Sequence, residues 1–212
     1  MNKILIFSDY AWPFCYIGKG IVDELKKEFE IEDEWIPFEL HPEVPVEGKK
    51  VSELFPGMSV ESMFANLNNM GNKYGIKFSG ADFISNTHLA LLASEYAKEK
   101  GKFHEFHDKL FFVYFNEGKD IGDVELLKSI AESIGLNKEE IIKRIKDGSY
   151  ESNLEEAKNL AIQYEVNSTP TFIINDKHAI VGAQSIESFK KILNKWEFWD
   201  SYMVKLTYKE GI

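Results

Sequence analysis

The single cysteine of the chain, Cys15, is the residue best suited to chemistry, because a free thiol can become a nucleophilic thiolate. It lies between an apolar run, Lys3 to Phe7, that predicts a buried strand and a helical pattern over Tyr16 to Phe29. A loop from strand to helix would hold the thiol near a helix N-terminus, where the helix dipole can lower its pKa. Pro13 suits the start of such a helix. The alternative is that Cys15 is a small buried hydrophobic residue, the ordinary role of a free cysteine.

A second feature lies far along the chain, where a polar, turn-like cluster precedes a proline and an apolar β-branched run. The segment is Asn167-Ser168-Thr169-Pro170-Thr171-Phe172-Ile173-Ile174. A proline is permitted at the first position of a strand, and a cis bond there would be a fixed structural feature. The chain therefore combines a strand, a thiol-bearing loop and a helix with a much later Thr-Pro before a hairpin.

This order of elements resembles the thioredoxin superfamily, and within it the DsbA-like branch and its FrnE-type proteins. The segments that carry the similarity are Phe7-Ser8-Asp9, Pro13-Phe14-Cys15-Tyr16-Ile17-Gly18, Pro37-Phe38-Glu39-Leu40-His41-Pro42, Asn86-Thr87, Tyr114-Phe115-Asn116-Glu117-Gly118-Lys119-Asp120-Ile121-Gly122-Asp123 and Gly182-Ala183-Gln184. The similarity runs from the first strand to about Trp196. It implies an α/β fold: a thioredoxin-like core with a mixed sheet in the strand order 2-1-3-4, and a large all-helical insertion.

The chain departs from this family at the redox motif. The family motif is Cys-Pro-x-Cys, whose first cysteine attacks the substrate disulfide, and Trp12 stands at that position here. Only the second, resolving cysteine remains, as Cys15. Trp12 could be a lid that makes Cys15 inert, or a stacking surface for a ligand beside a partly exposed thiol. With one cysteine the protein could form mixed disulfides, but it could not resolve them internally.

The resemblance also implies which other residues line the site. It places a cis Thr169-Pro170 bond against the Trp12–Cys15 loop, where the backbone of Thr169 can pair with an extended ligand. Asn86 is expected first to cap a helix and second to line the site. The turn before the last helix could bind a carboxylate through its amides, and a plain capped turn is an equal alternative. The predicted site comprises Cys15 as the catalytic residue, Trp12, Pro13 and Phe14 in the loop, and Thr169, Pro170, Asn86, Gln184 and Ser185 as substrate-binding residues.

Composition limits the expected partners and location. The formal charge of −10 argues against nucleic acid and anionic membranes, which both require a basic surface. A single cysteine excludes an intramolecular disulfide, and neither a signal-peptide core nor a membrane-spanning run is present, so we expect a cytoplasmic protein. His104 and His107 are expected on a solvated helix face rather than at a metal. We expect no cofactor, with glutathione or another small thiol as the possible exception, and a small thiol or peptide as substrate.

Hydrophobic spacing predicts the remaining elements. The second strand is centred on residues 35–38, and Pro37 within it favours an edge position. A loop is expected over residues 41–57, which are rich in proline and glycine. Helices are expected over 60–74, 87–100, 103–114, 124–134, 137–146, 149–164 and 185–196, strands over 171–174 and 179–181, and the alternation from Tyr202 onward permits a further strand. The core then comprises residues 1–51 and 166–212, and the helical insertion comprises residues 52–165.

Three functions are compatible with these features. The first is a DsbA-like, FrnE-type thiol–disulfide oxidoreductase or isomerase that is limited to monothiol exchange by its Trp-Pro-Phe-Cys motif. The second is a glutathione-dependent isomerase or transferase, because 2-hydroxychromene-2-carboxylate isomerase and kappa-class glutathione transferases share the inserted-helix architecture. Those proteins carry serine where Trp12 stands. The third is a non-catalytic module that keeps the cleft for a peptide or an aromatic ligand.

Overall fold

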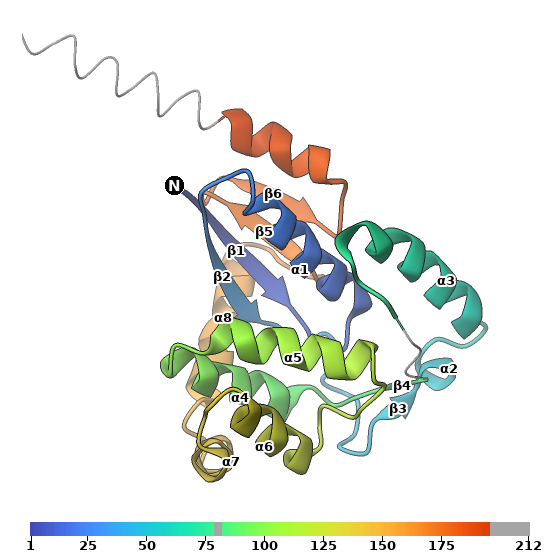
Figure 1. Ribbon diagram of the computed structural model, residues 1–212, viewed down its shortest axis with the longest axis vertical. Coiled ribbons are helices and arrows are strands. Elements are labelled where there is room, and N and C mark those ends of the chain that lie inside the picture. The colour runs from blue at the N-terminus through green and yellow to red at the C-terminus, as the bar shows by residue number, and fades with distance from the viewer. Residues whose placement is uncertain (79–81, 196–212) are drawn as a thin grey trace, which may run out of the picture.

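A mixed four-stranded sheet forms the centre of the fold in the computed structural model, which describes residues 1–78 and 82–195 (Figure 1). The strands are β1 (Asn2–Ser8), β2 (Ile31–Pro37), β5 (Thr171–Ile174) and β6 (His178–Val181). Their order is β2-β1-β5-β6, with β2 parallel to β1 and the other two neighbouring pairs antiparallel. The predicted strand order is confirmed, and the proline-containing β2 lies at the edge as expected.

The alternation of side chains along β1 divides the core between the two faces of the sheet. Ile4 and Ile6 belong to the large cluster on the side of α1 (Pro13–Leu25). Leu5 and Phe7 point the other way and pack with Ala157 of α8 (Glu151–Gln163). Figure 1 shows α1 in front of the sheet and α8 behind it. The strands are therefore buried on both faces, which explains the continuous apolar run of β1.

The helices between β2 and β5 begin and end close to the predicted positions. They include α3 (Val60–Gly71), the 3₁₀ helix η1 (Asn72–Tyr74), α4 (His88–Glu99), α5 (Phe103–Phe115), α6 (Val124–Ser133) and α7 (Lys138–Lys146). Asn137 caps α7 by accepting the backbone N–H groups of Glu139 and Glu140, both at 3.0 Å. Gly75 ends η1 with a φ of +71°, a conformation that favours glycine. A further helix covers residues 186–195.

The prediction of a loop over residues 41–57 is wrong in its second half. A turn from Pro45 to Gly48 redirects the chain into β3 (Lys49–Lys50), which pairs with β4 (Phe83–Ile84), and α2 (Val51–Leu54) follows directly. Gly48 has a φ of +75°, and a Cβ there would lie 2.9 Å from the carbonyl oxygen of Ile84. The close approach of two backbones therefore requires this glycine, which sequence inspection treated only as a loop signal. The insertion thus carries one short strand, β4, besides its helices.

The prediction of a solvated face for His107 is also wrong. Its side chain is buried, with 2% of the residue exposed, and stacks on Phe103 at 4.9 Å between ring centroids. Phe103, His107 and Phe111 are spaced four residues apart on one face of α5, where His107 and Phe111 are buried and Phe103 is half-buried. Only His104 has the expected exposure, at 58%. The helix is covered on two sides, so the polar residue lies in the core.

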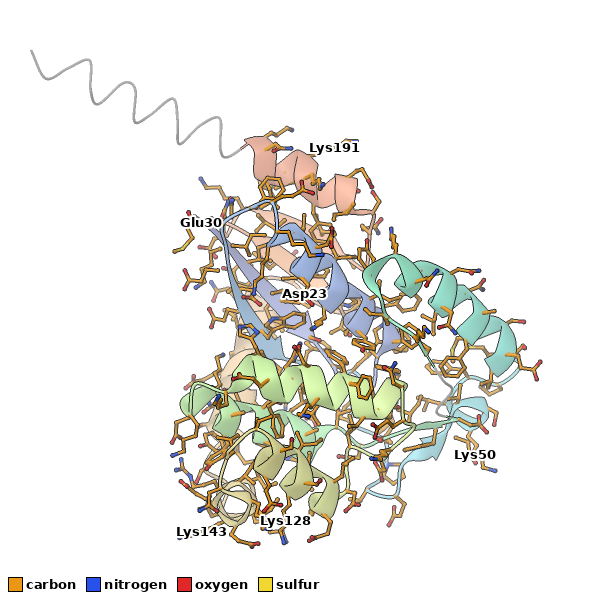
Figure 2. All side chains as sticks on the ribbon, in the orientation of Figure 1. Asp23, Glu30, Lys50, Lys128, Lys143 and Lys191 are labelled. Atoms are coloured by element: carbon orange, nitrogen blue, oxygen red, sulfur yellow. The ribbon has the colours of Figure 1, made fainter. Side chains whose placement is uncertain are left out.

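Charged side chains lie on well-separated elements at the surface. Figure 2 labels, for example, Lys50 beside α2, Lys143 on α7 and Lys191 on the final helix.

None of the helices in the described part is long and apolar enough to cross a membrane. Trp196 and the run from Tyr202 onward lie outside the described residues, so the last predicted strand stays a prediction, as does the division into core and insertion.

Candidate ligand site

The loop after β1 is held by the buried carboxylate of Asp9. This side chain accepts the backbone N–H of Ala11 at 3.1 Å and that of Leu40 at 2.7 Å. Burial raises the pKa of Asp9, and these two hydrogen bonds oppose the rise. The loop then enters α1 with Trp12 as the N-cap and Pro13 at the first helical position, and no side chain caps the helix. Asp9 therefore ties this loop to the segment that follows β2.

Cys15 lies at the start of α1, as predicted, but its side chain is fully buried, with 0% of the residue exposed. Burial raises the pKa of the thiol to about 12. The backbone N–H of Asp9, 3.5 Å from Sγ, and the nearby hydroxyls of Thr169 and Ser8 lower that pKa, but burial outweighs them. The stabilising effect of the helix terminus is therefore overcome. The thiol of Cys15 is therefore protonated at neutral pH.

The second predicted motif packs against the same helix. The Thr169–Pro170 peptide bond is cis, and Thr169 is buried. A Cβ added to Gly18 of α1 would lie 3.3 Å from Cγ of Pro170 and 2.9 Å from the ring of Phe172. The glycine therefore lets the helix approach the proline closely. Both the cis bond and its placement beside the thiol-bearing helix agree with the prediction.

The side chain of Trp12 packs among aromatic rings. Its ring centroid lies 5.9 Å from Phe14, 6.0 Å from His41 and 6.2 Å from Phe55. His41 also contacts Phe55, at 5.8 Å, and donates a hydrogen bond from Nδ1 to the carboxylate of Glu43 at 3.0 Å. Indole is thus half-buried at the position from which a family cysteine would attack a disulfide.

A cavity of about 380 Å³ opens beside Trp12, Pro13 and Phe14, between the start of α1 and the helices α2, α3 and α5. Its wall is mainly apolar and includes seven aromatic residues and three of the chain's five methionines. The aromatic and methionine residues are Trp12, Phe14, Phe55, Phe64, Phe83, Tyr114, Phe115, Met58, Met63 and Met70. None of the described lining residues carries a charge. Its polar side chains include those of Ser59, Ser62 and Asn66, in addition to Tyr114 with its hydroxyl group. Such a wall suits an uncharged apolar ligand.

Comparison with known proteins places this geometry in a family. The chain matches the model of the DSBA-like thioredoxin domain over residues 3–194. It belongs to the DsbA-like thioredoxin family. It is 30% identical over 195 residues to the uncharacterized protein YwbO of Bacillus subtilis, a match that covers 90% of this chain and 95% of the relative. It is 27% identical over 75 residues, or 35% of this chain and 36% of the relative, to the thiol:disulfide interchange protein DsbA of Pseudomonas aeruginosa.

Solved structures of the DsbA-like family and of related enzymes share the fold. A probable DsbA oxidoreductase from Streptomyces coelicolor has a TM-score of 0.84 and 25% identity, over 92% of this chain and 89% of that one. A 2-hydroxychromene-2-carboxylate isomerase has a TM-score of 0.69 and 16% identity, over 98% and 97% of the two chains. The isomerase likeness shows the fold alone. The fold that was expected to be shared with both groups is confirmed.

All five predicted substrate-binding residues of this DsbA-like chain, like Cys15, are absent from the wall of the cavity: Thr169 and Pro170 pack beside Cys15 and α1, and the other three make hydrogen bonds elsewhere. Asn86 donates to the carbonyl of Val44 at 2.7 Å and accepts the N–H of His88, the first residue of α4, at 3.1 Å. The N-cap residue of α4 is Thr87 rather than Asn86. The side chain of Gln184 donates to Val181 within its own turn, at 3.0 Å, and Ser185 bonds Ser188 at 3.2 Å. These contacts match the alternative of a plain capped turn.

Sequence inspection missed most of the cavity wall. The sequence predicts the helix over residues 60–74, but its spacing did not single out Met63, Phe64 and Met70 as residues of a binding site. On the same helix, Leu67 is fully buried. The richness in methionine was the available signal, because flexible thioethers are frequent at adaptable binding surfaces.

Proposed function

We propose that this protein binds an uncharged, largely aromatic small molecule in the cavity beside Trp12, and that it does not catalyse thiol–disulfide exchange. The observation that carries the proposal is the position of Trp12: its indole lines the cavity at the place of the family nucleophile, while Cys15 is fully buried. The redox site of the family is thus replaced by an apolar binding surface. This is the third of the functions that the sequence allows.

Thiol exchange is disfavoured on chemical grounds. The attacking species is a thiolate that must reach a disulfide, and the pKa of Cys15 is raised to about 12 by burial. A substrate disulfide would also have to reach the sulfur of Cys15, of which 0% is exposed. One cysteine also leaves no second thiol to resolve a mixed disulfide. Each of these conditions opposes even monothiol exchange.

The size and wall of the cavity favour an aromatic ligand. Its volume of about 380 Å³ is more than twice the roughly 150 Å³ of an engineered cavity that binds benzene, so about two or three rings fit. Aromatic faces pack well against flat rings. Ser62 and Asn66 supply hydrogen bonds on one side. Glutathione, with its carboxylates and ammonium group, meets no charged partner among the described lining residues, and this favours the aromatic ligand over a small thiol.

A fluorescent apolar probe, N-phenyl-1-naphthylamine, tests the proposal. Wild-type protein should bind it saturably, with increased probe fluorescence. Ser62→Trp places an indole at the cavity wall and should raise the Kd roughly tenfold or more, which corresponds to about 1.4 kcal/mol. Ser52→Trp is the matched control, because Ser52 is exposed on α2 and does not line the cavity.

Two results would contradict this function. Equal affinity in the Ser62→Trp and Ser52→Trp variants would move binding away from the cavity. Insulin reduction by wild-type protein that disappears in Cys15→Ser would restore the oxidoreductase hypothesis. The proposal also retains the FrnE-type subgroup and a cytoplasmic location, which is supported by the lack of cysteine pairs that need an oxidising compartment.

A further inference from the structure

A second, much smaller cavity lies under α5, beside the end of β1. Its volume is about 20 Å³, and it shares no lining residue with the ligand cavity, so its role does not depend on the proposed function. Apolar rings of the core form part of its wall. The polar side chains that line it are those of Ser8, Tyr10, Ser94, Glu95 and His107. Pro37 and Phe103 in its wall are half-buried, so the cavity lies at the edge of the core, and its buried polar atoms still need a partner.

The hydrogen bonds around the cavity define the tautomer of His107. Ser94 donates its hydroxyl proton to the carbonyl of Ala90 at 2.9 Å. Tyr10 must then donate to Oγ of Ser94, at 2.7 Å, because that hydroxyl has no second proton. The oxygen of Tyr10 accepts in turn from Nδ1–H of His107 at 2.9 Å. The proton of the neutral imidazole therefore lies on Nδ1, and Nε2 is left as an acceptor.

Two buried polar atoms at this cavity, Nε2 of His107 and Oγ of Ser8, make no side-chain hydrogen bond of good geometry to the described residues. The Ser8 hydroxyl also lies beside the thiol of Cys15. Glu95 is also buried, with 7% of the residue exposed, and receives a hydrogen bond from Asn153 through Oε2, at 2.8 Å. The cavity wall therefore offers an imidazole acceptor, a carboxylate acceptor and a hydroxyl group. Only a small molecule with two donors and an acceptor matches this set.

We propose that one water molecule is bound in this cavity. It donates to Nε2 of His107 and to the carboxylate of Glu95, and it accepts from the hydroxyl of Ser8. The volume agrees, because a buried water needs roughly 10–15 Å³ and the cavity has about 20 Å³. The number of bonds agrees as well, since buried waters make about three. The water completes the chain of hydrogen bonds that joins α5 to the loop after β1 through His107 and Tyr10.

The sign of a stability change distinguishes the bound water from a dry cavity. If the water is present, Ser8→Ala removes one of its partners and should lower the Tm by about 2–4 °C, the shift expected for one lost bond in a chain of this size. If the cavity is dry, the same variant removes an unpartnered hydroxyl and should leave the Tm unchanged or raise it. Ser85→Ala is the matched control, because its buried hydroxyl also lacks a partner among the described residues but lies outside the cavity.

Ser8 also lies beside the thiol, so the comparison is repeated in a Cys15→Ala background, where that contact is absent. A crystal structure that resolves ordered water supplies the direct observation: density within about 3 Å of Nε2 of His107 and Oγ of Ser8. Nitrogen NMR of the imidazole should show the Nδ1–H tautomer, with an Nε2 signal that shifts in Ser8→Ala and not in Ser85→Ala. A cavity without density, an Nε2–H tautomer, or a Tm for Ser8→Ala at or above wild type would each overturn the proposal.

Discussion

Two histidines on the helices between β2 and β5, His107 and His88, have pKa values that their surroundings shift in opposite directions. His107 on α5 is buried and bonds the hydroxyl of Tyr10, and burial lowers its pKa well below 6.5. His88, at the first position of α4, lies between Glu39 at 2.9 Å and Glu151 at 3.0 Å. Those hydrogen bonds raise its pKa to about 9. The same side chain thus serves as a neutral core residue in one region and as a cationic link in the other.

The comparison shows what decides the charge of a histidine in this fold. Around His107 the rings of Trp35, Phe103 and Phe111 bury the imidazole, and no carboxylate of the described residues bonds it directly. Around His88 both ring nitrogens meet a carboxylate, so both must donate and the ring must be cationic. Desolvation is the larger effect on the pKa of His107 because no carboxylate pairs with the ring to offset the lost hydration. Charge pairing is the larger effect at His88 because the ring keeps 35% of its exposure.

Removal of the buried His107 side chain should have the largest effect on stability. His107→Ala removes a ring that packs among aromatic side chains and breaks the bond to Tyr10. We expect a loss of about 3–5 kcal/mol in the free energy of unfolding, the range for truncating a buried aromatic side chain. Urea unfolding at pH 7.5 measures it. His104→Ala, an exposed neighbour on the same helix, should cost less than about 0.5 kcal/mol. Equal costs for the two variants would refute the buried assignment.

A milder change isolates the charge of His107 from its volume. Because the folded pKa is lowered, unfolded chains bind more protons below the unfolded pKa of about 6.5, and stability is lost as the pH falls. The contribution reaches up to about 2 kcal/mol between pH 6.5 and 5. His107→Phe keeps the ring and should remove this part of the acid dependence. Urea unfolding of wild type and variant from pH 5 to 8 tests it, and parallel pH curves would mean that His107 does not titrate on unfolding.

The sequence predicts local features well and tertiary surroundings poorly. The helix predicted over 137–146 begins at its cap Asn137, and the helical pattern over 60–74 ends before Gly75, because caps depend on a few neighbouring residues. Pro37 places β2 at the edge because a missing N–H is a local property. His107 was misplaced because its burial depends on Trp35 and Tyr10, which are remote in sequence. Cys15 was placed correctly on α1, but the competition between burial and the helix terminus required the packing around its sulfur.

The smallest expected effect concerns the link at His88. Its folded pKa of about 9 exceeds the unfolded value of about 6.5, so its contribution is complete below pH 6.5 and is lost as the pH rises through 9. Since the ring is more than one-third exposed, solvent screening reduces the contribution to about 1 kcal/mol.

His88→Gln should therefore destabilise the protein by about 1 kcal/mol at pH 6 and by almost nothing at pH 10, as measured by urea unfolding at both values. His104→Gln is the matched control, because its nearest carboxylate, on Asp33, lies at 3.8 Å and its ring is largely exposed. High salt should shrink the difference at pH 6, since the pair with Glu151 is partly exposed. If the loss of stability in His88→Gln stays constant from pH 6 to 10, the ring of His88 acts through packing and not through its charge. His88 and His107 would then differ only in how deeply they are buried.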